Sequence, residues 1–355
     1  MKTLRDFNVK NKRILVRSDF NVPLEENGNI LDDFRIRQSL STIKYLIKKG
    51  AKIILISHLG RPLEKSSNPK FQKYSLKPIA LRLEKLLKRK VRFLNDCIGK
   101  KVEKEVKEMR SGELILLENL RLYKEEEECD LKFAKNLAKL GQIFINDAFG
   151  VCHRLHASVT GIPKFLPSGV GFLIEKELKN LDKIIKNPKL PLIAVIGGTK
   201  VETKAGVINK ISEFADFILV GHLIFKELNE KKILLKHPQK IIGPINKKEI
   251  KSIPYDIGTK TISLFKEKIE KAKTIFWSGP LGKIEEEKFQ KGSREIARAI
   301  VESKAFSVAG GGETVEFLNK IKITKKFDYI STGGGAMLSY LSGNKLPGLE
   351  AIDKQ

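Results

Sequence analysis

The chain has 355 residues, of which 41% are hydrophobic and 31% are charged. This length favours about two domains, with enough apolar material for two cores. No apolar run is long enough to cross a membrane, and the first residues, 1–6, have no apolar stretch typical of a secretory signal. The 3 cysteines are far apart and fit neither a disulfide framework nor a zinc site. We therefore expect a cytoplasmic protein that does not associate with membranes.

The formal net charge of +26 attracts polyanions of every kind. A nucleic-acid site would need basic residues gathered on one face, with aromatic side chains for stacking. Here lysine is spread over most predicted helices, and aromatic residues make up only 7% of the chain. The pattern favours a lysine-rich solvated surface without a specific nucleic-acid partner. A basic nucleic-acid-binding protein remains the less favoured alternative.

Short apolar segments alternate with amphipathic ones along the N-terminal half. The spacing of apolar residues predicts helices over residues 35–49, 76–87 and around 126–140. Apolar runs of strand length lie between them. These predicted strands are 13–17, 51–57, 114–117 and 142–145.

The C-terminal half repeats this alternation without obvious repetition of sequence. Its predicted strands are 190–196, 217–220, 274–277, 305–309 and 329–331, with helices between them. Such an alternation is typical of parallel sheets covered on both faces. We therefore expect an α/β protein with two Rossmann-like three-layer α/β/α domains joined by a hinge helix.

The domain boundaries follow from the stop signals. A helical pattern over 175–186 ends at Asn187-Pro188, just before a strand. We expect an N-terminal domain at 1–170, a connecting helix at 171–187 and a C-terminal domain at 188–340. The tail 341–355 is too apolar for a free end, and we expect it to pack back on the body.

Cationic or proton-donating residues follow four successive strands of the N-terminal half. They are His58 and Arg61 after the second strand, Arg121 after the third, and His153 and Arg154 after the fourth, with Asp19 and Asn21 after the first. Ligands of open α/β sheets bind beyond the carboxyl ends of the strands. Guanidinium groups bind carboxylate and phosphate in bidentate fashion, so the set favours a small substrate that carries both. Taken alone, the segment 18–23 is more typical of a turn with capping side chains than of a binding site.

Glycine clusters mark the C-terminal half. Segments 197–200, 310–314 and 332–336 each follow an apolar run and precede a helical pattern. A glycine turn at a helix start presents free backbone N–H groups and the positive end of the helix dipole, which suits phosphate. Lys200 and Lys204 are four residues apart and share a helix face. Neither a P-loop motif nor a G-x-G-x-x-G motif is present.

Taken in order, these segments resemble phosphoglycerate kinases over nearly the whole chain. No single segment is decisive, but their order and spacing together are highly specific. The matching segments are 17–23, 57–62, 118–121, 146–150, 153–158, 197–204, 279–282, 310–314, 332–336 and 346–348.

The resemblance implies a reaction and its partners. A phosphoryl group moves reversibly between 1,3-bisphosphoglycerate and ADP, giving 3-phosphoglycerate and ATP, with Mg²⁺. The implied ligands of 3-phosphoglycerate or its acyl phosphate are Asp19, Asn21, Arg35, His58, Arg61, Arg121 and Arg154. The implied nucleotide ligands are Lys200, Lys204, Glu285, Gly311, Gly312, Glu313 and Thr314, with Glu285 on the ribose and Glu313 on the metal.

A carboxylate acceptor needs no general base, so catalysis would consist of positioning and of neutralising charge on the moving phosphoryl group. We expect Arg35 to neutralise that group from one side and Lys200, with the glycine turn of Gly333 and Gly334, from the other. Closure of the hinge would bring the two sites together in a monomeric enzyme.

Several positions depart from the family pattern. Glu313 stands where the family usually has Asp, Thr203 where it has Asp, and Ser278 where it has Asn. The turn at 221–224 has lost glycines, and the segment 225–254 is shorter than usual. All these changes lie in the nucleotide half. A degenerate relative that binds phosphorylated ligands with little catalysis is therefore an open alternative.

Overall fold

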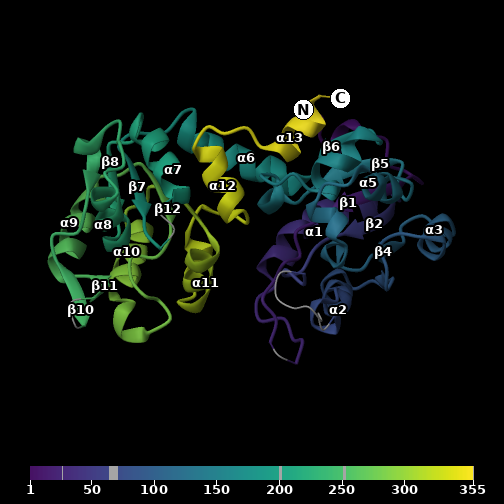
Figure 1. Cartoon of the computed structure of the whole chain (residues 1–355), viewed down its shortest axis with the longest axis horizontal. Coiled ribbons are helices and arrows are strands. Elements are labelled where there is room, and N and C mark those ends of the chain that lie inside the picture. Colours follow the sequence, from purple (N-terminus) through teal and green to yellow (C-terminus); the bar gives the residue numbers. More distant parts are fainter. Residues whose placement is uncertain (26, 64–70, 200–201, 251–252, 355) are drawn as a thin grey trace. The chain divides into compact units, whose positions relative to one another are not determined.

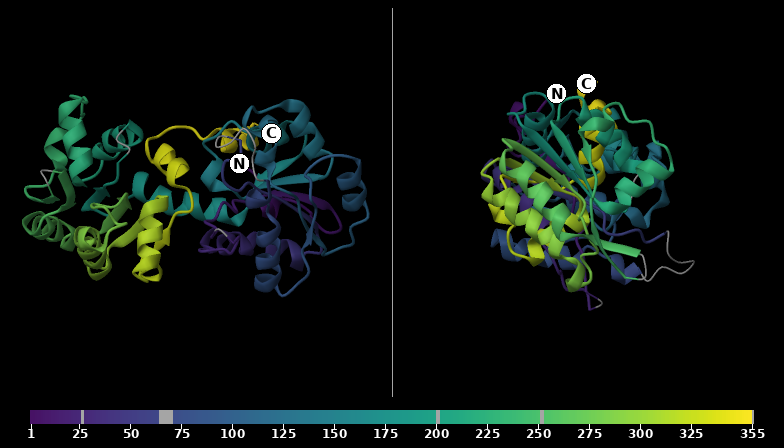
Figure 2. Two further views of the ribbon diagram at one scale, coloured as in Figure 1. Left: turned by 60° about the horizontal axis from the view of Figure 1, so that its bottom comes forward. Right: turned by 90° about the vertical axis from the view of Figure 1, so that its left-hand side faces the viewer.

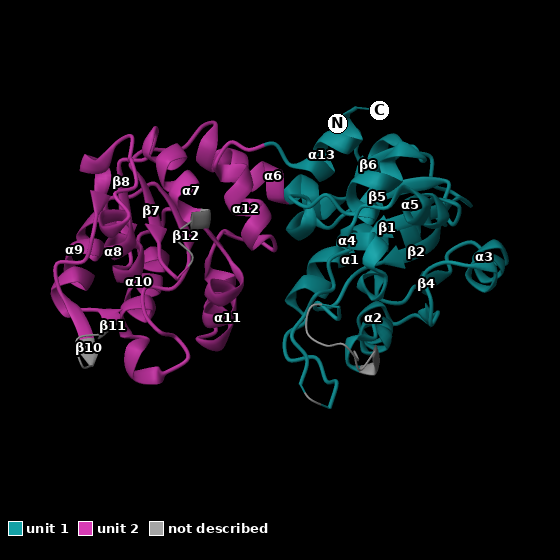
Figure 3. Cartoon of the chain, in the orientation of Figure 1, with its two compact units in different colours: residues 1–176, 345–355 teal, residues 177–344 magenta. Residues whose placement is uncertain are grey.

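The computed structural model describes residues 1–355 except 26, 64–70, 200–201, 251–252 and 355 (Figure 1). The chain forms two compact units (Figure 3). Unit 1 contains Met1–Lys176 and Lys345–Gln355, and unit 2 contains Glu177–Asn344. No helix among the described residues combines the length and the apolar character that a bilayer crossing requires.

Unit 1 is built on a six-stranded sheet in which every neighbouring pair is parallel. Its strand order is β3-β4-β2-β1-β5-β6. The strands are β1 (Arg13–Arg17), β2 (Lys52–Ile56), β3 (Arg92–Phe93), β4 (Leu114–Leu116), β5 (Ile143–Asn146) and β6 (Ser168–Val170). The four strands predicted here are confirmed to within about a residue at each end, whereas β3 and β6 were not predicted.

Alternation of side chains along the strands gives this sheet two apolar faces. Ile14 and Val16 of β1 pack in a core with α1 (Phe34–Lys48) and α2 (Lys77–Leu87). Leu15, between them in sequence, packs in a second core with α3 (Lys100–Lys107) and α5 (Leu131–Ala138). Successive residues of a strand point to opposite faces, so helices cover both sides, as Figure 2 shows. The predicted three-layer arrangement is confirmed.

The single helix expected around residues 126–140 is wrong. The segment forms α4 (Lys124–Glu127) and α5, separated by a left-handed residue, Cys129, with a φ of 57°. Asp130 then caps α5 by accepting a hydrogen bond from the Phe133 amide at 2.6 Å. An aspartate at this position satisfies a free N–H group of the first turn, so the break is built into the sequence.

The C-terminal helix α13 (Pro347–Asp353) lies in unit 1. The Gly348 amide donates to the Cys152 carbonyl at 2.9 Å, and the Met1 ammonium lies 2.8 Å from Asp353. Glycine is required at this contact because a Cβ atom would lie 2.7 Å from Cγ1 of Val159.

Unit 2 contains a second parallel six-stranded sheet, in the order β14-β13-β12-β7-β8-β9, and a separate antiparallel pair, β10-β11. The strands are β7 (Leu192–Ile196), β8 (Phe217–Val220), β9 (Ile241–Ile242), β10 (Lys247–Ile250), β11 (Ile253–Ile257), β12 (Thr274–Ser278), β13 (Phe306–Gly310) and β14 (Tyr329–Ile330). All five predicted strands are confirmed, whereas β9, β10 and β11 were not predicted.

The helices of unit 2 flank this sheet. Helix α9 packs on α10, and α7 packs on α12. The helices are α7 (Glu202–Ser212), α8 (His222–Glu230), α9 (Thr259–Glu270), α10 (Lys291–Glu302), α11 (Gly312–Lys320) and α12 (Gly334–Leu341). Helix α6 (Phe172–Ile185) begins in unit 1, and its residues from Glu177 onward belong to unit 2.

A buried carboxylate holds the start of α6 within unit 1. Asp147 follows β5, and its Oδ1 accepts a hydrogen bond from the Leu173 amide at 2.9 Å. Gly171 is required beside it, because a Cβ atom there would overlap the carboxylate. Burial raises the pKa of Asp147 to about 7, although the hydrogen bonds from Thr42, Leu173 and Ile174 oppose this shift.

This raised pKa predicts a pH-dependent stability. Above about pH 4 the unfolded chain loses the Asp147 proton while the folded chain keeps it, so the stability contributed by this group falls as pH rises towards 7. The full effect is on the order of 4 kcal/mol. Urea unfolding of the wild type and Asp147→Asn at about pH 5 and about pH 8 should show a larger loss of stability with pH in the wild type. Equal losses in the two proteins would contradict the assignment.

Candidate active site

The loops that carry the predicted cations of unit 1 begin at one level of the sheet. Arg17 at the end of β1 is in register with Ile56 of β2 and Asn146 of β5. Leu55 is likewise in register with Leu116 of β4. Because all four strands are parallel, the loops after them meet at one edge, as ligand sites of such sheets require. We call this the substrate edge.

The first loop is tied to α1 and to the second loop. Arg35, in the first turn of α1, places Nη1 3.2 Å from Oδ2 of Asp19 and donates to the Asn21 carbonyl at 3.0 Å. The Asn21 side chain accepts from the Gly60 amide at 2.9 Å. Asp19 is almost completely buried, whereas the Arg35 side chain remains 28% exposed. The guanidinium is thus fixed by two oxygens and keeps a solvent-facing side for an anion.

Arg121 reaches the same edge from η3 (Leu120–Leu122). Its Nη1 donates to the Gly60 carbonyl at 2.8 Å, and its Nε lies 3.2 Å from Glu127. Burial lowers the pKa of Arg121, Glu127 opposes this, and the nearby charge of Arg61 adds to the lowering. The Gly60 loop therefore joins the Asn21 side chain to the Arg121 guanidinium.

The histidines of the substrate edge are neutral at physiological pH. Burial, followed by the charges of Arg17, Arg121 and Arg35, lowers the pKa of His58 well below its usual value. Burial and nearby arginines, among them Arg154, lower the pKa of His156 to about 3. Burial and Arg154 lower the pKa of His153 to about 4. The positive charge at this edge therefore comes from arginine.

All seven predicted substrate residues belong to this edge. Asp19, Asn21, Arg35 and Arg121 are linked to one another through hydrogen bonds and the Gly60 loop, and His58 bonds to Arg17, whereas Arg61 and Arg154 are exposed. Sequence analysis missed the buried layer beneath them, Arg17, Glu126 and Ser158. The charge of Arg17 inside a buried strand was one signal for it, and the matching segments 17–23 and 153–158 were another.

In unit 2, two glycine turns interlock at the ends of β7 and β12. The Gly197 amide donates to the Ser278 carbonyl at 3.0 Å, and the Gly198 amide donates to the Pro280 carbonyl at 2.7 Å. A Cβ atom on Gly197 would overlap the Pro280 carbonyl oxygen, and Gly279 has a φ of 91°. The close approach of the two backbones requires glycine at both places.

Lys204 lies across these turns. Its Nζ donates to the Gly197 carbonyl, and the side chain is nearly buried. Its ammonium would lie 2.7 Å from a Cβ atom on Gly198. A buried ammonium at a glycine turn provides a fixed positive charge for an anionic group. Lys200, predicted as its companion, lies outside the described residues.

The two late glycine turns begin neighbouring helices. Gly311 has a φ of 102° and precedes α11, and a Cβ atom on Gly334 at the start of α12 would lie 3.2 Å from Cα of Gly311. Gly312 has open space around it, and Gly333 is the N-cap residue of α12. The positive ends of two helix dipoles are therefore adjacent. The Thr314 hydroxyl accepts from the Gly279 amide at 2.7 Å, so it joins two turns.

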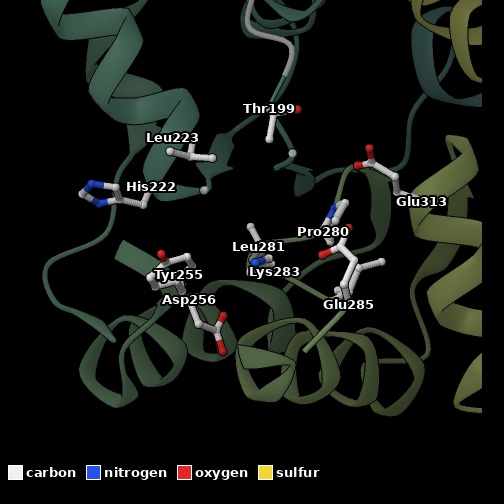
Figure 4. A pocket seen from close by; sticks show the side chains of 14 residues that line it. Thr199, His222, Leu223, Tyr255, Asp256, Pro280, Leu281, Lys283, Glu285 and Glu313 are labelled. Carbon is white, nitrogen blue, oxygen red and sulfur yellow. The ribbon is translucent and has the colours of Figure 1, made fainter. Parts of the chain in front are cut away.

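A pocket of about 330 Å³ opens beside these turns. Figure 4 shows His222, Leu223 and Tyr255 at one end and Glu313 at the other, with Glu285 on the same wall as Pro280. Tyr255 stacks on Phe289 with ring centroids 4.7 Å apart, which makes a flat apolar wall. The pocket thus has an aromatic end, where the buried Asp256 lies beside Tyr255, and an acidic end with the exposed Glu313. Sequence analysis did not assign His222, Leu223 or Tyr255 to a nucleotide pocket, and it described the turn at 221–224 only as having lost glycines.

The acidic end of the pocket carries the exposed carboxylate of Glu313. Among the described residues, no cluster of three or more His, Cys, Asp or Glu side chains could hold a metal unaided. Mg²⁺, however, is usually held by one or two carboxylates together with substrate phosphates. Glu313 is exposed at the start of α11, and its Oε2 lies 3.6 Å from where a Cβ atom on Gly198 would be. The donor set therefore fits a metal that arrives with a polyphosphate.

Comparison with known proteins decides the family. The model of the family described as phosphoglycerate kinase matches residues 4–234 and 228–344. The chain belongs to the phosphoglycerate kinase family.

Similar family members cover the chain almost completely. The phosphoglycerate kinase of Coprothermobacter proteolyticus is 41% identical over 391 residues, with 99% of this chain and 98% of the relative covered. That of Aquifex aeolicus is 41% identical over 394 residues, with the same shares covered.

Solved phosphoglycerate kinases share the fold. That of Pyrococcus horikoshii has a TM-score of 0.87 at 33% identity, and that of Coxiella burnetii 0.80 at 31%. In both cases 99% of this chain and 98% of the other chain are covered. The predicted resemblance and fold class are confirmed.

The close contact between the glycine turns predicts different effects of alanine at Gly197 and at Gly312. Gly197→Ala should lower the stability of unit 2 by at least about 2 kcal/mol, because its Cβ atom meets a backbone carbonyl that cannot move freely. Gly312→Ala should leave stability nearly unchanged, since nothing lies within 4 Å of its Cβ position. Thermal unfolding followed by circular dichroism measures both. Similar melting temperatures for the two variants would contradict this account of the turns.

Proposed function

We propose that the protein catalyses the reversible, Mg²⁺-dependent transfer of a phosphoryl group between 1,3-bisphosphoglycerate and ADP, giving 3-phosphoglycerate and ATP. The observation that carries the proposal is the substrate edge, where arginines from loops and α1 gather at the ends of four parallel strands. A small molecule with a carboxylate and a phosphate matches that arrangement of guanidinium groups.

The residues of the substrate edge have different roles in binding the substrate. Arg35, Arg121, Arg61 and Arg154 supply positive charge to the acidic substrate. Asn21 and Asp19 hold the first loop and Arg35 in place through the hydrogen bonds described above. His58 supplies a neutral polar contact because its pKa is lowered.

The pocket of unit 2 takes the nucleotide. The aromatic end suits a flat base, and Glu285 suits the ribose hydroxyls. Lys204, Lys200 and the N–H groups at Gly311, Gly312 and Gly334 suit the phosphates, and the Thr314 hydroxyl holds the turns together. Glu313 would help to hold Mg²⁺, which neutralises phosphate charge when bound.

The chemistry needs positioning more than proton transfer. The acceptor oxygen of 3-phosphoglycerate is a carboxylate, so no general base is needed. Catalysis then consists of alignment and of neutralising charge on the moving phosphoryl group. We assign that neutralisation to Arg35, Lys200 and the turn of Gly333 and Gly334. The reacting atoms must approach to about 3 Å, so we propose that α6 acts as a hinge. We also propose that the protein works as a cytoplasmic monomer.

One alternative has specific support. The departures at Thr203, Ser278, Glu313 and the shortened segment 225–254 all lie in the nucleotide half, and the two family-model matches overlap at residues 228–234, inside that segment. A relative that binds phosphorylated ligands without efficient turnover would show this pattern.

An assay separates these possibilities. ADP release from MgATP is coupled to NADH oxidation and recorded with and without 3-phosphoglycerate. The proposal expects turnover that requires both 3-phosphoglycerate and Mg²⁺. A rate equal to the blank, with 3-phosphoglycerate binding retained in calorimetry, would reject it in favour of the degenerate relative.

Arg35 offers a test of transition-state neutralisation. Arg35→Ala should lower kcat by about 10³-fold while the Kd for MgATP changes less than about threefold, because its charge acts on the transferred group. Arg37→Ala is the matched control: it lies on the same helix, is exposed and pairs with Asp33 at 2.8 Å. Steady-state kinetics and calorimetry give both quantities. Equal losses of turnover and of MgATP affinity would refute the role of Arg35.

Glu313 offers a test of the metal assignment. Glu313→Gln should weaken MgADP binding by about tenfold and leave ADP binding in EDTA unchanged within about twofold, since only the metal-bound form uses the carboxylate. Glu316→Gln, one turn along α11 and exposed, should change neither. Calorimetry in the two buffers provides the comparison, and an equal effect on both forms would exclude a metal role.

A further inference from the structure

The substrate edge rests on a buried ionic layer formed by Arg17, Glu126 and Ser158. Arg17 is the last residue of β1 and Glu126 belongs to α4, and both are 0% exposed. Burial lowers the pKa of Arg17, and the nearby Glu126 charge opposes that shift. Arginine stays protonated in proteins, so a full positive charge lies directly beneath the edge.

The orientation of the Arg17 guanidinium is fixed from three sides. Its Nε donates to Oγ of Ser158 at 2.8 Å, and its Nη1 donates to the Ser18 carbonyl at 2.5 Å. Glu126 holds the far side of Ser158, accepting from its hydroxyl at 2.5 Å and from its amide at 2.9 Å. These bonds leave Nη2 pointing at His58, with 3.2 Å between Nη2 and Nδ1 of the imidazole.

This contact determines where the imidazole proton lies. A guanidinium has five N–H donors and no acceptor, so it can only donate to Nδ1 of His58. Nδ1 must therefore carry no proton and offer its lone pair. The imidazole is neutral, and its single proton is on Nε2.

The surroundings of His58 favour the same state. Burial disfavours a positive charge on the imidazole, and so do the charges of Arg17 from β1, Arg121 from η3 and Arg35 from α1; the nearby His156 is itself neutral. Oε1 of Glu126 lies 3.9 Å from Nη2 of Arg17. The Arg17 guanidinium separates this carboxylate from the His58 imidazole. The ring is thus a neutral donor within a group of cations.

We infer that Arg17 is a positioning residue that holds His58 as its neutral Nε2–H tautomer, so that His58 offers one N–H donor to a substrate oxygen. The location of that oxygen rests on the proposed function. A histidine held in this way does not change charge near neutral pH, unlike an ordinary imidazole. The donor at this contact therefore stays the same over roughly pH 5.5 to 8.

The tautomer is measured directly in the full chain without ligand. Nitrogen-15 NMR of histidine-labelled protein resolves the ring nitrogens of 5 histidines, and His58→Gln identifies the His58 signals by their loss. The inference expects an unprotonated Nδ1, a protonated Nε2 and no titration between roughly pH 5.5 and 8. A proton on Nδ1, or titration near the ordinary value of about 6.5, would overturn it.

A variant pair tests the role of Arg17. Arg17→Gln should raise the KM for 3-phosphoglycerate by about tenfold, make it depend on pH more steeply than in the wild type and populate both His58 tautomers, while the KM for MgATP changes less than about twofold. Arg13→Gln, at the opposite end of β1 where Nε donates to the Leu140 carbonyl, is the control and should leave all of these unchanged. If Arg17→Gln does not fold, the wild-type spectrum still decides the question. An unchanged His58 tautomer in folded Arg17→Gln would contradict the role of Arg17.

Substitutions of His58 itself provide a second readout. The glutamine amide nitrogen reaches the place of Nε2, whereas that of asparagine reaches the place of Nδ1. His58→Gln should therefore keep more affinity for 3-phosphoglycerate than His58→Asn, and the reverse order would count against the inference. Because the NMR experiment uses no substrate, an inactive protein with the expected tautomer would refute the proposed function alone. An active protein with Nδ1 protonated would refute the inference alone.

Discussion

The parallel register of the strands is the constraint on which the sites of both units depend. In unit 1, Arg17 is level with Ile56 and Asn146, so the loops after three strands start together. In unit 2, Ser278 is level with Ile196 and Gly310, so the glycine turns at 197, 279 and 311 start together. A parallel sheet buried on both faces leaves its strand ends as the free polar surface. Residues that are far apart in sequence therefore meet at this edge because of the strand register alone.

The two units use this frame with opposite chemistry. Unit 1 places side chains at the edge: guanidinium groups supply the charge, and a buried ionic layer beneath them fixes a neutral imidazole. Unit 2 places backbone there, because glycine at 197 and 279 lets two turns approach until their N–H and carbonyl groups bond directly. A small acidic substrate needs directed charges, whereas a polyphosphate can be held by N–H groups and helix ends. Under the proposed function, this difference accounts for arginine after the strands of unit 1 and glycine after those of unit 2.

Much of this arrangement could be predicted from the sequence because strand patterns and turn residues are local signals. The strands at β1, β7 and β12 and the cluster around Asp19, Arg35 and His58 followed from such patterns and from the family resemblance. The helix break at Cys129 was missed because a left-handed non-glycine residue leaves little trace in apolar periodicity. Arg17 was placed in a strand and in the matching segment 17–23 but was given no role, since its burial and its bond to His58 depend on residues more than 40 positions away. Tyr255 was missed because its segment departs from the family pattern, and Lys200 lies outside the described residues.

The central claim is that an acidic three-carbon compound and a magnesium nucleotide are held by separate units of one chain. Hydrogen–deuterium exchange with each ligand added singly tests it most directly. The account predicts that 3-phosphoglycerate slows exchange in the loops after β1, β2, β4 and β5, and that MgADP slows exchange at residues 197–204, 279–285 and 310–314. Protection of one unit by both ligands, or protection outside these segments alone, would contradict it.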